Sequence, residues 1–251
     1  MHPIYTKDWS IAVNTGIKCN AKGIAVDAGK RYISSPFDNM DSVEGLVEAA
    51  QLLALRFKGY FDNPAQWKVK TLVRPERTVK VIWHEDYPGL HYPHFHVGWF
   101  EGTGITRLSL KAWIEDVNGT VDVIWPGFSA RFGTRAERLV RIMESGNRVL
   151  FLRIEEHSQL KNLCRRDFAE DTQRFCDIIA AAYPDLDFGV LYYYSPDPGR
   201  ARPQSTDRIC FEPITAKRRE AVFVTEKLKE VRLRPIEDLV LGENSAEPMT
   251  A

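Results

Sequence analysis

The chain has 251 residues, of which 44% are hydrophobic and 11% aromatic, so a sizeable buried core is available. Its 34 basic and 34 acidic residues cancel, which excludes an overall field that would attract nucleic acid or an acidic membrane. The sequence has no apolar run long enough to span a bilayer and no signal-peptide pattern at its start, and its four cysteines form no CxxC pair. We therefore expect a cytoplasmic protein with reduced thiols and with neither a nucleic-acid nor a membrane partner.

The first sixty residues predict a strand, a turn and two helices. A short apolar run over 10–13 leads to Gly16, and apolar residues between 21 and 28 then recur at the i, i+3, i+4, i+7 spacing of one helix face. A second helix is predicted over 43–57, where apolar residues keep to a single stripe.

The middle of the chain, from 66 to about 126, is predicted to be β-rich. It contains the runs WKVKTLV, TVKVIW, HFHVGWF and TVDVIW, which are rich in Val, Ile and Trp and are separated by Pro, Gly and Asn. Thr134 and Glu137 then have the spacing of a capping box, which predicts that the next helix starts at Thr134.

The C-terminal half predicts strands that alternate with helices. RVLFLRI and DFGVLYYY are nearly continuous apolar runs, typical of strands covered on both faces, and a helix is expected between them from about 160 to 183. RICFEPI is predicted to be an edge strand. This order predicts an α/β fold with a mostly parallel sheet and crossover helices. We expect one domain over 1–242, with the β-rich segment at about 66–126 as an insertion, and a disordered tail over 243–251.

Cys19 is the cysteine best placed for chemistry. Cys164 and Cys176 fall beside or on apolar helix stripes, as buried and inert cysteines usually do. Cys19 is expected in the first turn of the first helix, pointing away from its apolar stripe. Unpaired backbone amides, the helix dipole and the neighbouring Lys18 would lower the pKa of a thiol there. This position favours a nucleophilic thiolate.

Four of the six histidines are concentrated in the segment HEDYPGLHYPHFH, at His84, His91, His94 and His96. On a strand, His94 and His96 would point to one face, where they could serve a thiolate as general base or bind a metal ion. The alternative is a solvent-facing side of a half-buried strand. His-hydrophobe-His also occurs in nucleases with a downstream tyrosine, and Tyr192–Tyr194 lies downstream, but the zero net charge argues against that class.

The segments NTGIKCN, SSPFDN, RFKGYF, a histidine after an aromatic residue, and RFGTRAERLVRIMESGNRVLFLRI follow one another in an order that resembles the bacterial papain-like cysteine peptidase family. The resemblance extends from about Ser10 to Tyr194. It places Cys19 on the family's Gly-x-x-Cys motif and Asp38 on its Pro-Phe-Asp motif. The chain departs from the family at Asn39, where a tryptophan is common, and no acidic residue follows His94 or His96.

The resemblance implies a cysteine peptidase or related thiol hydrolase that acts on a peptide, amide or ester without a cofactor. Cys19 would attack a carbonyl, His94 or His96 would transfer the proton, and amides of the first helical turn would stabilise the oxyanion. The third, orienting residue is open between Asp38, Asp116 and Asn118. The residues expected to bind substrate are Gly16, Asn20, Arg131 and Arg153. The alternative function is a metal-dependent or ligand-binding protein built on His84, His91, His94 and His96.

Overall fold

The structure is a computed structural model that describes most of the chain. The described residues are 1–16, 20–30, 33–38, 40, 45–73, 78–93, 95, 97–100, 103–106, 109–110, 113–114, 121–154, 168–196, 201–214 and 220–241. The tail predicted over 243–251 lies outside them. Every helix within these ranges is too short or too polar to cross a lipid bilayer.

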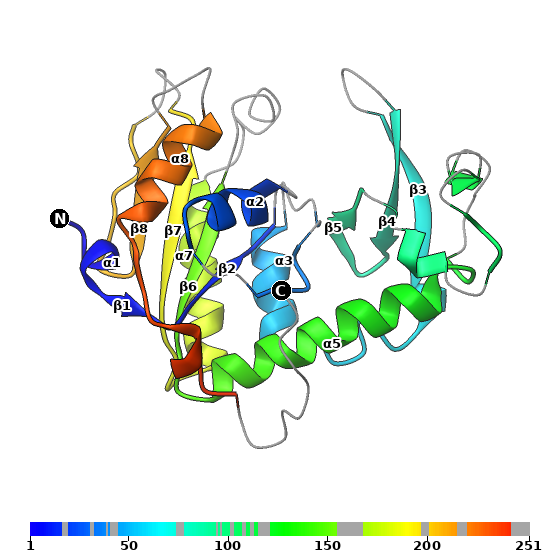
Figure 1. The fold of residues 1–251 in the computed structure, drawn as a ribbon, viewed down its shortest axis with the longest axis horizontal. Coiled ribbons are helices and arrows are strands. Elements are labelled where there is room, and N and C mark those ends of the chain that lie inside the picture. Colours follow the sequence, from blue (N-terminus) through cyan, green and yellow to red (C-terminus); the bar gives the residue numbers. More distant parts are fainter. Residues whose placement is uncertain are drawn as a thin grey trace.

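A four-stranded, fully parallel sheet organises one side of the molecule (Figure 1). Its strands, in spatial order, are β2 (Ile11–Asn14), β6 (Arg148–Ile154), β7 (Asp187–Tyr194) and β8 (Ile209–Pro213). Strand β6 is buried from its second residue to its last, as expected for a strand that is paired on both edges and covered on both faces. The predicted parallel sheet is confirmed, and so is the position of RICFEPI at its edge.

Helices cover both faces of this sheet. Their bounds are α2 (Asn20–Asp27), α3 (Leu46–Ala54), α5 (Trp125–Glu144), α7 (Phe168–Ala182) and α8 (Glu220–Lys229). Val149 and Phe151 pack in the same cluster as the buried residues of α3, α5 and α7. Leu150 and Leu152 pack in a second cluster with α2 and α8. The two-residue period of β6 therefore divides its side chains between two helical layers.

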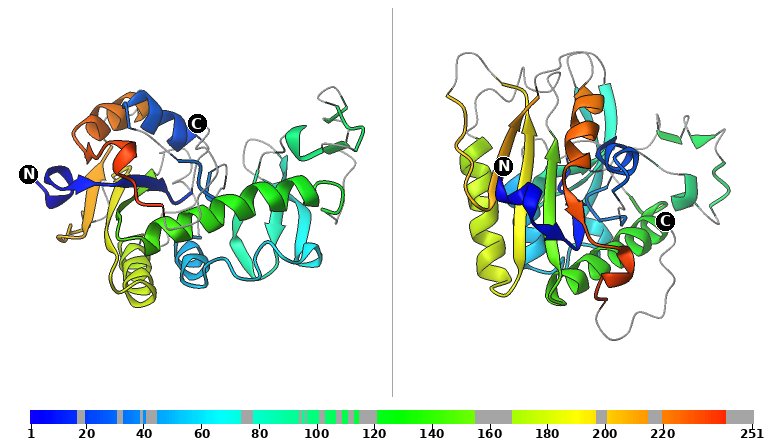
Figure 2. Two further views of the ribbon diagram at one scale, coloured as in Figure 1. Left: turned by 60° about the horizontal axis from the view of Figure 1, so that its bottom comes forward. Right: turned by 60° about the vertical axis from the view of Figure 1, so that its left-hand side comes forward.

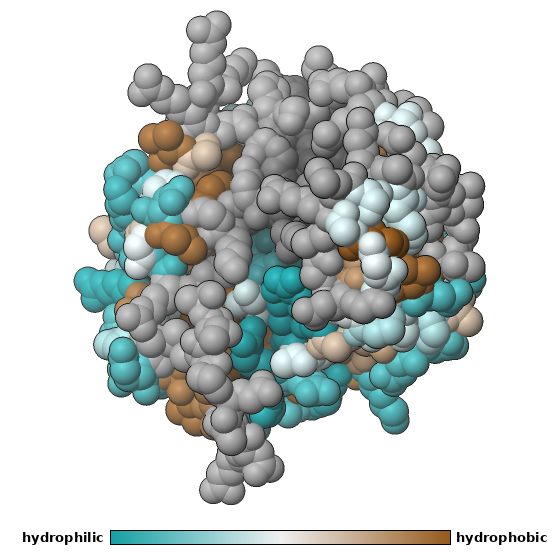
Figure 3. Space-filling view, turned by 45° about the vertical axis from the view of Figure 1, so that its right-hand side comes forward, coloured by the Kyte–Doolittle hydropathy of each residue, from teal (hydrophilic) through white to brown (hydrophobic). Residues whose placement is uncertain are grey.

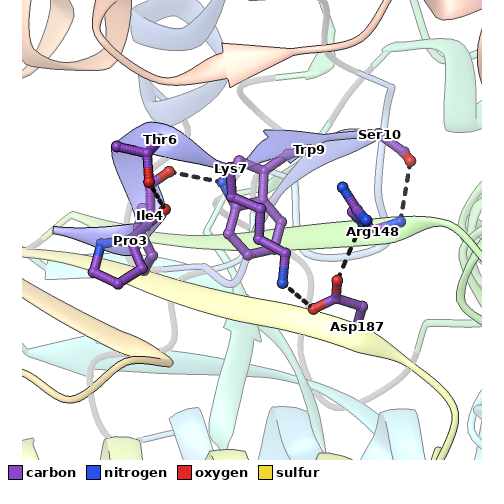
Figure 4. A network of polar contacts seen from close by, with 8 residues as sticks. All are labelled: Pro3, Ile4, Thr6, Lys7, Trp9, Ser10, Arg148 and Asp187. Carbon is purple, nitrogen blue, oxygen red and sulfur yellow. Dashed lines mark hydrogen bonds and ion pairs between the residues drawn. The ribbon is translucent and has the colours of Figure 1, made fainter.

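The N-terminal segment closes the amino edge of the sheet (Figure 4). It contains α1 (Pro3–Thr6) and β1 (Asp8–Trp9), and β1 pairs in parallel with β9 (Arg232–Leu233). Lys7 and Arg148 both form ion pairs with Asp187. The buried Trp9 donates from Nε1 to the Ile4 carbonyl at 2.8 Å.

A second, antiparallel sheet forms the other side of the molecule. Its strands are β3 (Trp67–Val73), β4 (Thr78–His84) and β5 (Tyr87–Tyr92), preceded by the 3₁₀ turn η1 (Pro64–Gln66). Helix α5 runs from this sheet to the parallel sheet, as two views show (Figures 1 and 2). One hydrophobic cluster extends across both sheets, with Val13 and Phe151 at one end and Trp67 and Tyr92 at the other.

The second half of the predicted β-rich segment is different from the prediction. Val97–Phe100 is a 3₁₀ turn, η2, and the described residues 121–124 form a turn that leads into α5. Helix α5 begins at Trp125 and passes through Thr134, so the predicted helix start at the capping box is wrong. The Thr134 hydroxyl instead donates to the Ala130 carbonyl, 2.9 Å away and one turn back. Buried Phe128 and Phe132 extend the helix, because their packing outweighs a local capping preference.

The helix predicted over 43–57 needs an earlier end. The helix predicted over 43–57 is α3, and it ends before Arg56 and Phe57, which both have φ of 55°. Left-handed backbone at two consecutive residues cannot continue a right-handed helix. The described part of the helix predicted from about 160 is α7. A last 3₁₀ turn, η3 (Ile236–Asp238), follows β9.

Two glycines of α5, Gly127 and Gly133, differ in how closely η2 packs against them. A Cβ atom at Gly127 would lie 2.7 Å from the Trp99 Cα and 2.8 Å from its carbonyl oxygen, whereas one at Gly133 would meet nothing within 4 Å. We expect Gly127→Ala to lower the free energy of unfolding by ~1–3 kcal/mol through overpacking. The matched variant Gly133→Ala should raise it by ~0.5–1 kcal/mol, because alanine favours a helix interior. Urea denaturation of both variants measures this, and equal effects would contradict the close contact.

Candidate active site at the carboxyl edge

The carboxyl end of β2 begins a strand-turn-helix connection. Gly16 has φ of 90°, a conformation that favours glycine, and its N–H donates to the Asn14 side-chain oxygen at 3.2 Å. Helix α2 begins at Asn20, which confirms the predicted order of elements. Cys19 and the side chain of Asn20 lie outside what the structure describes. Ligand sites of α/β proteins occur at this carboxyl edge, and β2 points from it towards the β3–β5 sheet (Figure 1).

Asp38 lies in a buried turn beside this edge. Its side chain is 3% exposed and accepts from the Ser35 amide at 2.9 Å and from the Ser35 hydroxyl at 3.4 Å. The Phe37 amide donates in turn to the Ser35 hydroxyl at 3.2 Å. Asp38 therefore stabilises the local turn, whatever further role its carboxylate has.

Tyr92, the last residue of β5, joins the histidine-rich segment to this turn. Its buried hydroxyl donates to the Pro36 carbonyl at 3.0 Å, a contact between residues 56 positions apart. Burial raises the pKa of Tyr92 well above its ordinary value, while the charge of Arg135 lowers it and that of Asp38 raises it. Both charged groups therefore act electrostatically on the Tyr92 hydroxyl. His94 and His96, which follow it in sequence, are outside the described residues.

An arginine of α5 reaches this turn, and an arginine of β6 reaches the end of β2. Arg138 donates to the Ser34 carbonyl at 2.7 Å, and Arg153, which is 1% exposed, donates to the Thr15 carbonyl at 3.2 Å. Burial lowers the pKa of the Arg135 guanidinium, and Asp38 opposes this shift. Arg131 is exposed, one turn before Arg135. Of the predicted substrate-binding residues, the structure therefore brings Gly16 and Arg153 to this edge, with Arg131 on the adjoining helix.

The two described histidines of the cluster lie on opposite faces of their sheet. His84 is 2% exposed and stacks on Tyr60 with ring centroids 4.9 Å apart, on the core side. His91 pairs in register with Trp83, whose side chain points the other way from that of its neighbour His84. His84 and His91 cannot then share one metal ion. Within the described ranges, no three His, Cys, Asp or Glu residues are grouped to hold a metal ion.

One contributor to the site, Tyr92, was not identified from the sequence. No sequence pattern pointed to Tyr92, because a tyrosine at the end of a strand is common and does not by itself indicate a site. Arg135 and Arg138 belong to the arginine-rich segment that carries the family resemblance, and their i, i+4, i+7 spacing with Arg131 places all three on one side of a helix. In Figure 3, the coloured hydrophobic groups reach the surface in separate places among hydrophilic ones.

Comparison of the chain with protein-family models, with curated proteins and with solved structures finds no match.

His84 should make the stability of the protein depend on pH. Its Nδ1 accepts from the Asp86 amide at 3.1 Å, and burial lowers its pKa, with Asp86 and Glu85 opposing. His84 therefore binds a proton more readily in the unfolded chain than in the folded protein. We expect the free energy of unfolding to fall as the pH is lowered below about 6.5, the ordinary histidine pKa, and to be unaffected by His84 above it.

Denaturation of the wild type and of His84→Asn between pH 5 and 8 measures this dependence. Asparagine keeps an acceptor for the Asp86 amide but does not titrate, so the variant should have the flatter profile. Equal slopes in the two proteins would show that His84 is not responsible.

Proposed function

We propose that this protein is a papain-like thiol hydrolase in which Cys19 is the nucleophile and His94 or His96 is the general base. The substrate class is a peptide, amide or ester, and the reaction needs no cofactor. The proposal combines the reactivity expected of the Cys19 thiol with the contacts of described residues that are near Cys19 and His94 in the sequence.

The hydrogen bond from Tyr92 to Pro36 is the observation that supports the proposal most strongly. It ties the end of β5, two residues before His94, to the Pro-Phe-Asp turn. That turn packs in the same hydrophobic cluster as Val13, through Ile33 and Phe37. Val13 lies three residues before Gly16. The strand that precedes Cys19 and the strand that precedes His94 therefore both have a link to the Pro-Phe-Asp turn, the first through a shared hydrophobic cluster and the second through a hydrogen bond.

The two described cysteines, Cys176 and Cys210, are poor nucleophiles, so neither is the candidate catalytic residue. Burial raises the pKa of Cys176 to about 12 and, together with the nearby charge of Glu212, raises that of Cys210 to about 12. Both thiols are therefore almost fully protonated at neutral pH. Cys164 lies outside the described residues and was predicted to be buried beside an apolar stripe.

The proposed reaction has two steps. The Cys19 thiolate attacks the substrate carbonyl, and the histidine, having taken the thiol proton, gives it to the leaving group as the acyl-enzyme forms. The histidine then takes a proton from water, which hydrolyses the acyl-enzyme and releases the thiolate. Amides of the first turn of α2 would stabilise the oxyanion in both steps. Asp38 supports the turn beside the site, and no separate orienting residue is assigned.

Selective alkylation tests the nucleophile. At pH 7, iodoacetamide should label Cys19 at least tenfold faster than Cys176 or Cys210, as measured by mass spectrometry of peptides. Cys19→Ser should also abolish hydrolysis of p-nitrophenyl acetate above background, whereas the control Cys176→Ala should keep it. Equal labelling of all cysteines, or full turnover by Cys19→Ser, would overturn the proposal.

Removal of the Tyr92 hydroxyl tests the link to the histidine segment. Tyr92→Phe leaves the buried Pro36 carbonyl without this donor, so we expect a loss of ~1–3 kcal/mol in the free energy of unfolding and a severalfold slower alkylation of Cys19. Tyr183→Phe is the matched control, because the Tyr183 hydroxyl donates to the Leu53 carbonyl at 2.6 Å, away from the site. It should lose stability but leave alkylation unchanged. Equal alkylation rates in both variants would separate Tyr92 from the site.

A further inference from the structure

We propose that the arginines of α5 form a binding site for one oxyanion, a carboxylate or a phosphate, with Arg135 as its principal donor. The inference rests on the proposed function in one respect, namely that the anion belongs to the substrate of that hydrolase. The binding itself can be measured without turnover.

The arginines form a row along one side of the helix. Arg131, Arg135 and Arg138 are four and three residues apart, which places them within about 60° of one another around the helix axis. Arg138 is anchored to the Ser34 carbonyl, so the row faces the turn that contains Asp38. Arg153, at the end of β6, donates to the Thr15 carbonyl from the neighbouring strand end. The row and Arg153 thus approach the carboxyl edge from two elements.

Arg135 has a hydrogen-bonding group ready for a ligand. Its side chain is half-buried and its guanidinium carbon lies 5.2 Å from the centroid of the Phe132 ring, which holds the group against the helix. Its Nη1 atom is buried and has no acceptor in the described part of the chain. A buried donor without an acceptor is unfavourable, and an oxyanion oxygen would satisfy it.

The charges around Arg135 also favour an anion. Burial lowers the pKa of its guanidinium most, Asp38 opposes this shift, and the neighbouring charges of Arg131 and Arg138 lower the pKa further. Both oxygens of Asp38 already face Ser35, through the amide and the hydroxyl. An entering anion would reduce the repulsion between the guanidiniums and could accept two parallel hydrogen bonds from one of them.

A single small group suits this site better than a polyanion. Nucleic acid binding requires many cationic contacts on an accessible surface, but Arg153 is buried and Arg135 is half-buried. The chain as a whole also carries no net charge. The ligand chemistry is therefore one carboxylate or phosphate group, such as the end of a peptide chain or a phosphorylated substrate.

The test uses Cys19→Ser protein, so that hydrolysis cannot interfere, and titrates inorganic phosphate and, separately, acetate by isothermal calorimetry. We expect saturable binding of at least one probe, and the stronger probe distinguishes a phosphate from a carboxylate ligand. Adding Arg135→Gln should weaken that binding at least tenfold, and Arg135→Lys should weaken it less, since lysine keeps the charge but not the planar fork. The matched control is Arg141→Gln, six residues along α5 and on another side of the helix, which should leave binding unchanged.

The possible outcomes separate the two proposals. Saturable binding that is lost in Arg135→Gln supports the oxyanion site, even if no hydrolysis is ever found. Binding that is absent for both probes, or equal in Arg135→Gln and its parent, overturns the oxyanion site and leaves the Cys19 proposal standing. Circular dichroism checks that Arg135→Gln is folded. If it is not, Arg135→Lys decides, because equal binding by that variant and its parent would also overturn the assignment of the guanidinium fork.

Discussion

The parallel pairing of β6 between β2 and β7 is the constraint on which the rest of the structure depends. A strand that is hydrogen-bonded along both edges and apolar on both faces needs a helical layer above and below it. Helix α5 precedes β6 and helix α7 connects β6 to β7, as parallel pairing usually requires, and both ends of the sheet stay free of these helical layers. The N-terminal segment covers the amino end through Trp9 and the ion pairs of Asp187. The carboxyl end carries buried polar side chains, namely Asn14, Thr15 and Arg153.

Helix α5 links this sheet to the antiparallel one and carries the arginines to the carboxyl end. Its buried side contributes Phe128 and Phe132 to the core that reaches both sheets. The arginine row flanks that buried side and meets the turn of Asp38, at a contact between residues 104 positions apart. One side of α5 thus packs in the core, and the side next to it carries the arginines. A change in the rotation of α5 would move both together.

Local patterns predicted elements well where burial dominates and poorly where contacts with distant residues decide. The runs 148–154 and 187–194 are strands because continuous apolar residues suit a sheet covered on both faces. Strand β5 was not predicted, since its Pro88 and Gly89 are typical of a loop. The Gly89 amide nevertheless bonds the Glu48 carboxylate of α3 at 2.8 Å, which holds this edge strand in place. The capping box at Thr134 failed because aromatic packing continued the helix through it.

For the candidate site, the sequence by itself determined the strand-turn-helix order around Gly16 and the buried character of Cys176, because both follow from local periodicity. Only the tertiary structure decided that Tyr92 bonds Pro36, that the α5 arginines face Asp38, and that His84 and His91 point to opposite faces. The physical reason is that these contacts depend on which faces of distant elements pack together. Local periodicity specifies the face of each element that is buried, but not the partner that buries it.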